Sequence, residues 1–470
     1  MSEAKSYFFS GIGGSGMMPL AMIVRAGGAT VAGSDRMLDQ GRLAPKFEFL
    51  RSQGVALFPQ DGSGITGADQ IFVATAAIED HVPDMVKAKA LGLTRMTRAE
   101  LLAELFNAAP TGIAVGGTSG KSTVTGMIGW ILYATGRDPT VMNGAVMKNF
   151  ASADAPFASA LVGKGEAFVS EVDESDGSIA LYRPKIAVLN NITLDHKSLD
   201  ELRHLFHDFA LKAETVVLNL DDDETRLLAA ALPAEKLITY SSRDATADFY
   251  NPGGLDHTSL KGSDFVIRPP QTNVRERVFL RLPGLHNAQN ALAAIATAYA
   301  IGISPHDAAN ALAGFTGLRR RFEIVGEANG VIVIDDFAHN PDKIAATLRT
   351  LTHQYDRQRL LLFFQPHGYG PLRTMKQELA DTFAAEMGPD DVLIMPDPVY
   401  YGGTTDKSVG TADLIAGIAA RGRRAEHIPE RADCGERLVS LVRPGDRIVI
   451  MGARDDTLTL FAEEILAKLR

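Results

Sequence analysis

The order of apolar and polar positions along the chain predicts an α/β protein with parallel sheets. Short apolar runs alternate with longer segments in which apolar residues recur every three or four positions. This alternation is typical of parallel strands joined by helices that cover both faces of a sheet. The clearest predicted strands are 6–10, 30–35, 70–78, 215–219 and 331–338.

Breaks in this pattern divide the chain into three predicted α/β domains. A chain of 470 residues is longer than one ordinary core supports, so several domains are expected. We predict a Rossmann-like N-terminal domain at 1–107 and a central domain of the P-loop ATPase type at 108–313. A second Rossmann-like domain is predicted at 314–470.

Composition narrows the class of protein. Apolar residues make up 46% of the chain and charged residues 22%, which is typical of soluble globular proteins. The net charge of −10 and the lack of a long basic run argue against nucleic acid as a partner. We see no signal peptide and no apolar run long enough to span a bilayer, so no membrane partner is expected. The single cysteine, Cys434, excludes an internal disulfide, and a cytoplasmic location is predicted.

Residues 113–125, IAVGGTSGKSTVT, carry the strongest chemical signal. An apolar run turns through glycines into a helical pattern that starts at Lys121. Backbone N–H groups and a helix N-terminus suit phosphate, Lys121 would reach the outer phosphates, and the Ser122 hydroxyl would bind Mg²⁺. Val115 replaces one glycine of the generic phosphate-loop pattern, but the shorter form is present at 117–123. The alternative is a glycine-rich turn with a chance lysine.

A second glycine motif follows the first predicted strand. Glycines at 11, 13, 14 and 16 precede a helical pattern, and the second strand ends at Asp35. An acid there could bind ribose hydroxyls, so a dinucleotide fold and an NAD(P)-dependent dehydrogenase are possible. Taken alone, this signal is weak.

Acidic side chains follow two further predicted strands. Residues 171–176, EVDESD, carry four carboxylates at a strand end, where metal-binding acids lie in open α/β sheets. A solvated acidic turn is the alternative. Asp195 and His196 end the next strand, and His196 could be a ligand or only a structural histidine.

Three later segments also carry candidate chemistry. Asn287 and Asn290 begin an alanine-rich helix, where they could bind a purine edge or only cap the helix. Residues 319–321 are three arginines in a row, and arginine suits bidentate phosphate binding. Histidines stand in 335–341, DDFAHNP, and in 365–370, QPHGYG.

Taken in this order, the motifs resemble those of the Mur ligase family, ATP-dependent ligases that add amino acids or peptides to UDP-N-acetylmuramic acid. The resemblance covers essentially the whole chain. It is strongest to the alanine-adding branch and to its peptide-adding relative. It implies that a muramyl carboxylate attacks the γ-phosphate of ATP and that an amine, expected to be L-alanine, attacks the resulting acyl phosphate. ATP and Mg²⁺ are the implied cofactors of this step of peptidoglycan synthesis.

The resemblance also implies roles for particular residues. The residues implied to bind ATP are Gly117, Thr118, Ser119, Gly120, Lys121, Ser122, Thr123, Asn287, Asn290, Arg321, Asp336 and His339. The residues implied to bind the UDP substrate are Gly13, Gly14, Ser15, Gly16, Asp35, Thr75 and Arg98. The implied metal ligands are Ser122, Glu171 and His196, and the amine is assigned to His367 and Arg373. The implied catalytic residues are Lys121, Glu171, His196, Arg320 and Arg321.

Three positions depart from the family pattern. Phe206 stands where several members carry a carbamylated lysine, so no carbamate is expected. Ser119 replaces a histidine that is usual in the alanine-adding branch. The family's arginines after Gln-Pro-His are missing, because residues 368–371 are Gly-Tyr-Gly-Pro and the first arginine is Arg373. The added group could therefore be a peptide, and a non-catalytic nucleotide-binding protein is a further alternative. The sequence leaves open whether the protein is a monomer or a homodimer.

Overall fold

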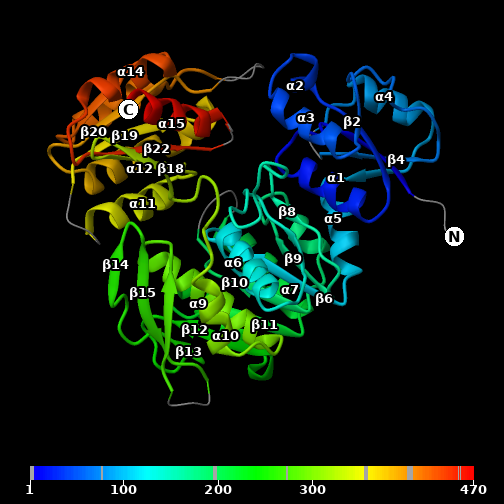
Figure 1. The fold of residues 1–470 in the computed structure, drawn as a ribbon, viewed down its shortest axis with the longest axis horizontal. Coiled ribbons are helices and arrows are strands. Elements are labelled where there is room, and N and C mark those ends of the chain that lie inside the picture. Colours follow the sequence, from blue (N-terminus) through cyan, green and yellow to red (C-terminus); the bar gives the residue numbers. More distant parts are fainter. Residues whose placement is uncertain are drawn as a thin grey trace. The chain divides into compact units, whose positions relative to one another are not determined.

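The computed structural model describes residues 5–75, 78–193, 198–270, 274–353, 358–399, 406–453, 455 and 457–470 (Figure 1). The chain forms two compact units. Unit 1 comprises residues 1–256, 264–281 and 287–316, and unit 2 comprises 257–263, 282–286 and 317–470. Among the helices of the described ranges, none is both long and apolar enough to cross a membrane.

The first sheet of unit 1 has five parallel strands in the order β3-β2-β1-β4-β5. Its strands are β1 (Ser6–Ser10), β2 (Thr30–Ser34), β3 (Ala56–Phe58), β4 (Gln70–Ala74) and β5 (Arg95–Thr97). Its helices are α1 (Met17–Ala26), α2 (Arg36–Asp39), α3 (Ala44–Ser52), α4 (Pro83–Ala90) and α5 (Arg98–Asn107). Neighbouring residues of β1 are buried on opposite faces, Phe8 against Phe72 and Phe9 in a separate cluster with Phe47. Burial on both faces explains why β1 is apolar throughout.

The second sheet of unit 1 has eight strands in the order β13-β12-β11-β10-β6-β9-β7-β8. Its strands are β6 (Thr111–Gly116), β7 (Thr140–Met142), β8 (Ala160–Leu161), β9 (Ala167–Glu171), β10 (Ile186–Leu189), β11 (Thr215–Asn219), β12 (Leu237–Ser241) and β13 (Phe249–Tyr250). The helices between and after them are α6 (Lys121–Ala134), η1 (Ser178–Leu181), α7 (Leu199–Lys212), α8 (Asp223–Ala231), η2 (Ala234–Lys236), α9 (Leu285–Ala300) and α10 (Pro305–Leu312). The order places β6 between β10 and β9, so the loops that follow these three parallel strands meet at one edge.

A small sheet in the order β14-β15-β16 comprises β14 (His257–Ser259), β15 (Gly262–Ile267) and β16 (Glu276–Leu280). Unit 2 is built on a six-stranded sheet in the order β17-β18-β22-β19-β20-β21, parallel except for the edge strand β17. Its strands are β17 (Glu323–Ala328), β18 (Val331–Asp336), β19 (Leu360–Gln365), β20 (Val392–Met395), β21 (Arg424–His427) and β22 (Arg447–Gly452). Its helices are α11 (Pro341–His353), α12 (Tyr369–Glu386), α13 (Thr411–Ala419), α14 (Arg431–Leu441) and α15 (Thr457–Lys468).

The one cysteine of the chain lies inside unit 2. Cys434, on α14, is fully buried against the sheet, and its thiol donates to the Ile428 carbonyl oxygen at 3.3 Å. Burial raises the pKa of this thiol to about 12.

The structure confirms the predicted α/β class and its parallel sheets. The predicted strands 6–10 and 215–219 coincide with β1 and β11. The strand predicted at 70–78 is shorter, because β4 ends at Ala74. The antiparallel edge strand β17 was not predicted, since it directly follows an arginine-rich turn. The domain boundaries at 107/108 and 313/314 stay a prediction.

Candidate functional site

The loop between β6 and α6 has the backbone that its glycines predict. Gly117 has φ +117° and Gly120 has φ +84°, values that favour glycine. A Cβ atom at Gly120 would lie 2.7 Å from Asn190 Nδ2 and 2.7 Å from Asn290 Oδ1. The turn therefore requires glycine at Gly120 for both conformation and space, and α6 begins at Lys121 as predicted.

The segment that follows the neighbouring strand β10 is hydrogen-bonded to this loop. The Asn191 side-chain oxygen accepts from the Ser119 N–H at 2.8 Å and from the Thr118 hydroxyl at 2.8 Å. The Thr118 N–H also donates to the Asn191 carbonyl oxygen at 3.2 Å. These bonds fix the first half of the loop before any ligand enters.

The side chains of Lys121 and Ser122 face the acids that follow β9. The Lys121 ammonium donates to both Glu174 carboxylate oxygens, at 2.9 and 3.2 Å, and to the Gly117 carbonyl oxygen at 2.7 Å. The Ser122 hydroxyl donates to Glu171 Oε2 at 2.7 Å. The phosphate loop and the predicted acidic cluster thus meet in one unit.

One acid of this turn, Asp173, has a lowered pKa despite its burial. Burial alone would raise the pKa of Asp173. Hydrogen bonds from Ser175 and the nearby charges of Lys121 and Arg98 instead bring it below its ordinary value. Asp173 therefore stays ionised near pH 7.

Ser122 and Glu171 offer oxygen donors of the kind that Mg²⁺ prefers. A Cβ atom at Gly144 would fall 2.0 Å from Glu171 Oε1, so the space around this carboxylate exists only because that residue is glycine. Among the described residues, no group of three or more histidine, cysteine or acidic side chains could hold a metal. The third predicted ligand, His196, and its neighbour Asp195 lie outside the described residues.

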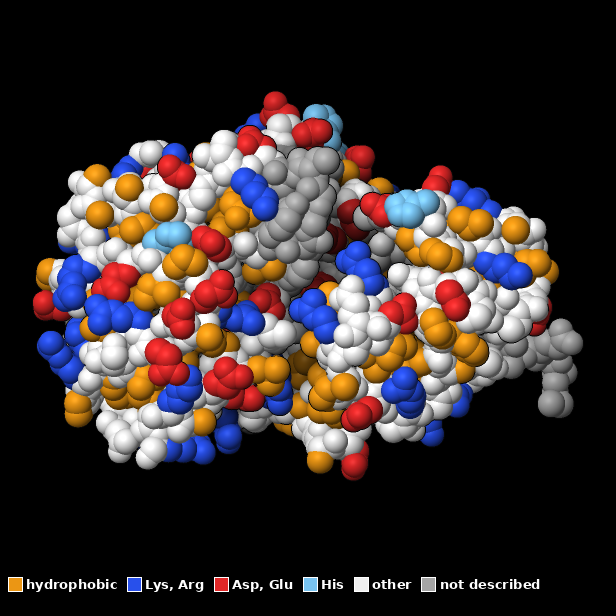
Figure 2. All heavy atoms as spheres, turned by 90° about the horizontal axis from the view of Figure 1, so that it is seen from above, with side chains coloured by type: hydrophobic (Ala, Val, Ile, Leu, Met, Phe, Trp, Pro, Cys, Tyr) orange, Lys and Arg blue, Asp and Glu red, His pale blue; other side chains and the backbone are white. Residues whose placement is uncertain are grey.

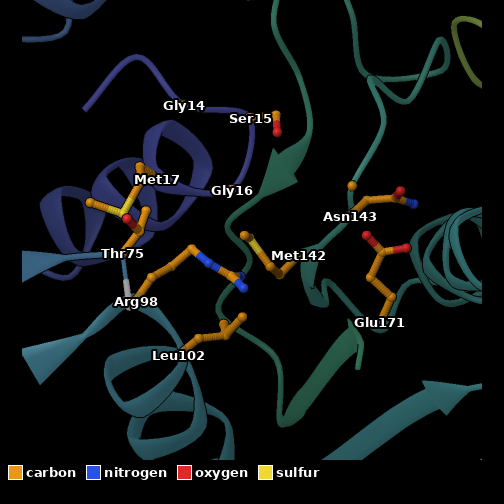
Figure 3. Close-up of a pocket in the computed structure, with 11 residues that line it drawn as sticks. Gly14, Ser15, Gly16, Met17, Thr75, Arg98, Leu102, Met142, Asn143 and Glu171 are labelled. Atoms are coloured by element: carbon orange, nitrogen blue, oxygen red, sulfur yellow. The ribbon is translucent and has the colours of Figure 1, made fainter. Parts of the chain in front are cut away.

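A cavity of about 350 Å³ opens beside Glu171 (Figure 3). It is lined by Gly14, Ser15, Gly16, Met17, Thr75, Arg98, Leu102, Met142, Asn143, Gly144 and Glu171. Figure 3 shows Thr75 and Arg98 on one side of it and Asn143 and Glu171 on the other. Five residues predicted to bind the UDP substrate therefore share one cavity with a predicted metal ligand.

A smaller cavity of about 100 Å³ continues toward the phosphate loop. It shares Arg98, Leu102 and Glu171 with the larger one and adds Lys121 and Asp173. Arg98 lies 3.7 Å from the Asp176 carboxylate. A substrate in the large cavity could therefore extend an acidic group past Arg98 to Lys121.

Asp35 and Gly13 lie behind the first glycine loop. The Asp35 carboxylate accepts from the Gly13 N–H and from the Met37 N–H, each at 2.8 Å, and the residue is only 8% exposed. The Lys46 ammonium donates to the Gly13 carbonyl oxygen at 3.1 Å. One Asp35 oxygen therefore holds the loop and the other caps α2, so both oxygens already have partners within the domain.

Of the two asparagines at the start of α9, Asn290 lies beside the phosphate loop and Asn287 is bonded to Asn290. Asn290 Nδ2 donates to Asn287 Oδ1 at 3.3 Å, and Asn290 also borders Gly120. The proximity of Asn290 to the loop is consistent with its predicted role at the nucleotide.

Within unit 2, the neighbouring arginines 320 and 321 have different surroundings. Arg320 has φ +57° and is 8% exposed. Its guanidinium donates to Asp335 Oδ1 at 3.3 Å and to the carbonyl oxygens of Asp455 and Gly452 at 2.9 and 2.8 Å. Both guanidinium groups also lie over the Phe337 ring, 5.2 Å from its centroid for Arg320 and 4.7 Å for Arg321. Of the two predicted phosphate ligands, Arg320 is engaged inside the unit.

The other predicted residues of unit 2 lie after β18 and β19. The Asp336 carboxylate accepts from the N–H groups of Phe322 and Ala338 at 2.5 and 2.8 Å. The rings of His339 and His367 meet edge to face, 5.3 Å apart. Burial, followed by the nearby charge of Lys343, lowers the pKa of His339 to about 3, so this imidazole is neutral near pH 7.

Two of the departures from the family pattern have clear surroundings. Arg373 Nη1 donates to the Asp406 carboxylate at 2.8 Å, on an exposed part of α12. Phe206 is completely buried in the core of unit 1.

Sequence reasoning missed Met142, Asn143 and Gly144, which line the large cavity. Asn143 Nδ2 donates to the Ser122 carbonyl oxygen at 2.9 Å and so links this segment to the phosphate loop. The Asn-Gly pair after a short strand was the available signal, since such pairs mark turns.

Surface charge is mixed. On the face shown in Figure 2, lysine and arginine side chains are interspersed with aspartate and glutamate. This pattern accords with the mixture of charges in a chain whose net charge is −10.

Comparisons with known proteins agree along the whole chain. Three family models match, described as "Mur ligase family, catalytic domain" at 6–109, "Mur ligase middle domain" at 115–298 and "Mur ligase, glutamate ligase domain" at 320–454. The UDP-N-acetylmuramate–L-alanine ligase of Agathobacter rectalis is 32% identical in sequence to this chain. The match covers 98% of this chain and 97% of the length of that ligase.

Two solved structures are also similar. The UDP-N-acetylmuramate-alanine ligase of Thermotoga maritima has a TM-score of 0.78 at 22% identity, covering 98% of both chains. The murein peptide ligase of Psychrobacter arcticus has a TM-score of 0.72 at 26% identity, covering 99% of both. With the glycine loops, the acidic cluster and their shared cavities on the same framework, the chain belongs to the Mur ligase family.

Proposed function

We propose that this protein is an ATP-dependent ligase that joins an amine to the carboxyl group of a UDP-N-acetylmuramate-type substrate. The observation that carries the proposal is the pair of adjoining cavities in unit 1. The larger cavity is lined by the first glycine loop and Glu171, and the smaller one reaches Lys121. A UDP-sugar acid in the first would present its carboxylate where the phosphate loop presents the γ-phosphate.

The residues support a two-step reaction. A carboxylate oxygen bonds to the γ-phosphorus of ATP while the bond to the β-phosphate oxygen breaks, which gives an acyl phosphate and ADP. The amine nitrogen then bonds to the acyl carbon, inorganic phosphate leaves, and the nitrogen loses a proton. Lys121 would neutralise charge on the transferred group, and phosphoryl transfer depends mainly on such placement and charge. Arg98 would orient the acid between the two cavities.

Ser122 would hold one Mg²⁺, and Glu171 and His196 would hold a second Mg²⁺ near the substrate carboxylate. Bound there, Mg²⁺ would reduce the negative charge of the phosphates and of the entering carboxylate. Arg320 or Arg321 is proposed to contact the γ-phosphate. Asp336 and His339 are further proposed nucleotide ligands, and His367 is proposed for the amine.

For the amine, we propose an amino acid, with L-alanine first, because the curated relative at 32% identity is an L-alanine ligase. One observation favours a second candidate, a peptide. Residues 368–371 carry no cation, and Arg373 is paired with Asp406. Without a bidentate arginine, binding of a small free carboxylate loses about 2–4 kcal/mol, which a longer peptide could offset through other contacts.

Mass spectrometry of reaction products tests both candidates. Purified protein would be incubated with UDP-N-acetylmuramate, ATP, Mg²⁺ and pooled amino acids or short peptides, and phosphate release would be followed in parallel. We expect an amide product and phosphate release only when acid and amine are both present. ATP hydrolysis at the same rate with neither substrate would contradict the proposal, and the mass of the product distinguishes an amino acid from a peptide.

Two further properties belong to the same proposal. A cytoplasmic location suits nucleotide-linked substrates and a chain with a single, buried cysteine. We expect a monomer or a homodimer, which analytical ultracentrifugation would distinguish.

A further inference from the structure

The surroundings of Lys121 assign a role to Glu174 that the proposed reaction does not by itself require. A lysine ammonium has three protons and no acceptor. Here the two Glu174 oxygens and the Gly117 carbonyl oxygen provide three acceptors within 3.2 Å. A phosphate oxygen can therefore bind Lys121 only if one of these acceptors is given up.

Charge indicates which acceptor is lost. Glu174 is only 4% exposed, so its carboxylate is poorly screened by water. Nucleotide phosphates beside Lys121 would place further negative charge next to it, whereas Gly117 offers a neutral carbonyl. Like charges at such distances disfavour each other strongly at low dielectric. The Glu174–Lys121 pair is thus the contact that phosphate would replace.

We propose that Glu174 is a positioning residue that competes with nucleotide phosphates for Lys121. Its carboxylate holds the ammonium at the loop, yields it to the phosphates when nucleotide binds, and takes it back as product leaves. The inference rests on the proposed function, because it takes the loop at 117–123 to be the nucleotide site. It predicts that Glu174 weakens nucleotide binding and speeds release of ADP.

Two of the neighbouring acids are bonded or paired elsewhere. Glu171 accepts from the Ser122 hydroxyl, and Asp176 lies near Arg98, 3.7 Å away. Glu174 alone among these three carboxylates is bonded to the loop lysine. Its exchange for glutamine keeps a side-chain oxygen near the ammonium and removes only the charge.

The test is equilibrium binding of a non-hydrolysable ATP analogue with Mg²⁺ to the full chain. We expect Glu174→Gln to bind the analogue about tenfold more tightly than the wild type, equivalent to about 1.4 kcal/mol, and to release ADP more slowly, because the charge that competes for Lys121 is removed. Glu174→Asp, which keeps the charge, should remain close to the wild type. Glu104→Gln is the matched control. It removes the charge of an exposed acid on α5 that is paired with Lys5.

A double-mutant cycle separates competition from a structural effect. In a Lys121→Ala background, Glu174→Gln should change affinity less than about twofold, because the group competed for is gone. Unchanged or weaker binding by Glu174→Gln, or an equal gain in both backgrounds, would overturn the inference. If the wild type itself does not bind the analogue, the proposed function fails as well. A wild type that binds normally, without the gain in Glu174→Gln, refutes only the role of Glu174.

Discussion

The two glycine loops of unit 1 share a construction and differ in what their polar groups hold. Each follows a buried parallel strand and precedes a helix, and each has a lysine ammonium on a loop carbonyl oxygen, Lys46 on Gly13 and Lys121 on Gly117. In the first loop the acid, Asp35, accepts from the Gly13 backbone N–H. In the second, Glu174 accepts from the lysine itself.

This difference separates a loop that only shapes a cavity from one that can perform chemistry. A buried acid on a backbone N–H fixes the loop permanently, because that N–H cannot move without unfolding the turn. A lysine side chain can change partners by rotation. A glycine fingerprint therefore indicates a close approach of backbone to ligand in both cases, whereas the position of the cation decides between binding and phosphoryl transfer.

The largest expected effect comes from replacing each of the two lysines with alanine. Lys121→Ala should lower kcat of ligation on the order of 10³-fold, because it removes the main charge stabilising phosphoryl transfer. Lys46→Ala should instead raise KM for the UDP substrate about tenfold with kcat nearly unchanged, because only the loop shape is affected. Steady-state kinetics of phosphate release would measure both. An equal loss of kcat in the two variants would remove the proposed distinction.

Alanine at matched glycines should also separate the loops. Gly120→Ala adds a methyl group where asparagine side chains stand at 2.7 Å, at φ +84°, so analogue affinity should fall at least about 30-fold. At Gly14 the nearest atom to a new Cβ is a carbonyl oxygen at 3.3 Å, and φ is not in the left-handed region. For Gly14→Ala we therefore expect analogue affinity to change less than about threefold. Calorimetric titration would measure both affinities. A larger loss for Gly14→Ala than for Gly120→Ala would contradict this expectation.

Loss of Asp35, which bonds to the first glycine loop, should reduce the stability of the fold more than it reduces catalysis. Asp35→Ala leaves the buried Gly13 N–H without its acceptor and removes the cap of α2. The free energy of unfolding should fall by about 2 kcal/mol. Urea denaturation followed by circular dichroism measures this. Wild-type stability combined with a large kcat defect would instead give Asp35 a direct role at the substrate.

The smallest effect is an expected absence of change beside the second loop. Phe206 is fully buried, and a Cβ atom at Gly116 would lie 3.4 Å from its ring. With an apolar ring in place of a lysine, no carbamate can form at this position. Ligation should therefore be unaffected when CO₂ and bicarbonate are removed and then restored. A reproducible rise in activity on adding bicarbonate would contradict this expectation.

Local sequence patterns predicted the individual strands and helices better than they predicted which elements lie side by side. The run at 113–125 contains its own strand, turn and helix, so both β6 and α6 could be predicted from it. Asn143, Gly144 and Asn191 join the site only because the sheet order places β7, β9, β6 and β10 side by side. No local pattern reports that order, since it results from packing between distant segments.

The arginine run shows the same limit at the level of single side chains. Three consecutive arginines predict a phosphate contact without indicating which one faces inward. In the structure Arg320 has a left-handed backbone and its guanidinium donates to interior carbonyl oxygens, while both arginines lie over the Phe337 ring. Such a turn depends on the strand order of unit 2, which the sequence pattern alone does not contain.

The burial of Cys434 has a practical consequence for spectroscopy. A thiol with no exposed surface and a pKa near 12 reacts slowly with maleimide or nitroxide reagents at neutral pH. Cysteines introduced at chosen surface positions in units 1 and 2 would therefore take up label selectively, without first removing the natural one. Distances between such paired labels, recorded with and without nucleotide and UDP substrate, would test whether the two units move during turnover.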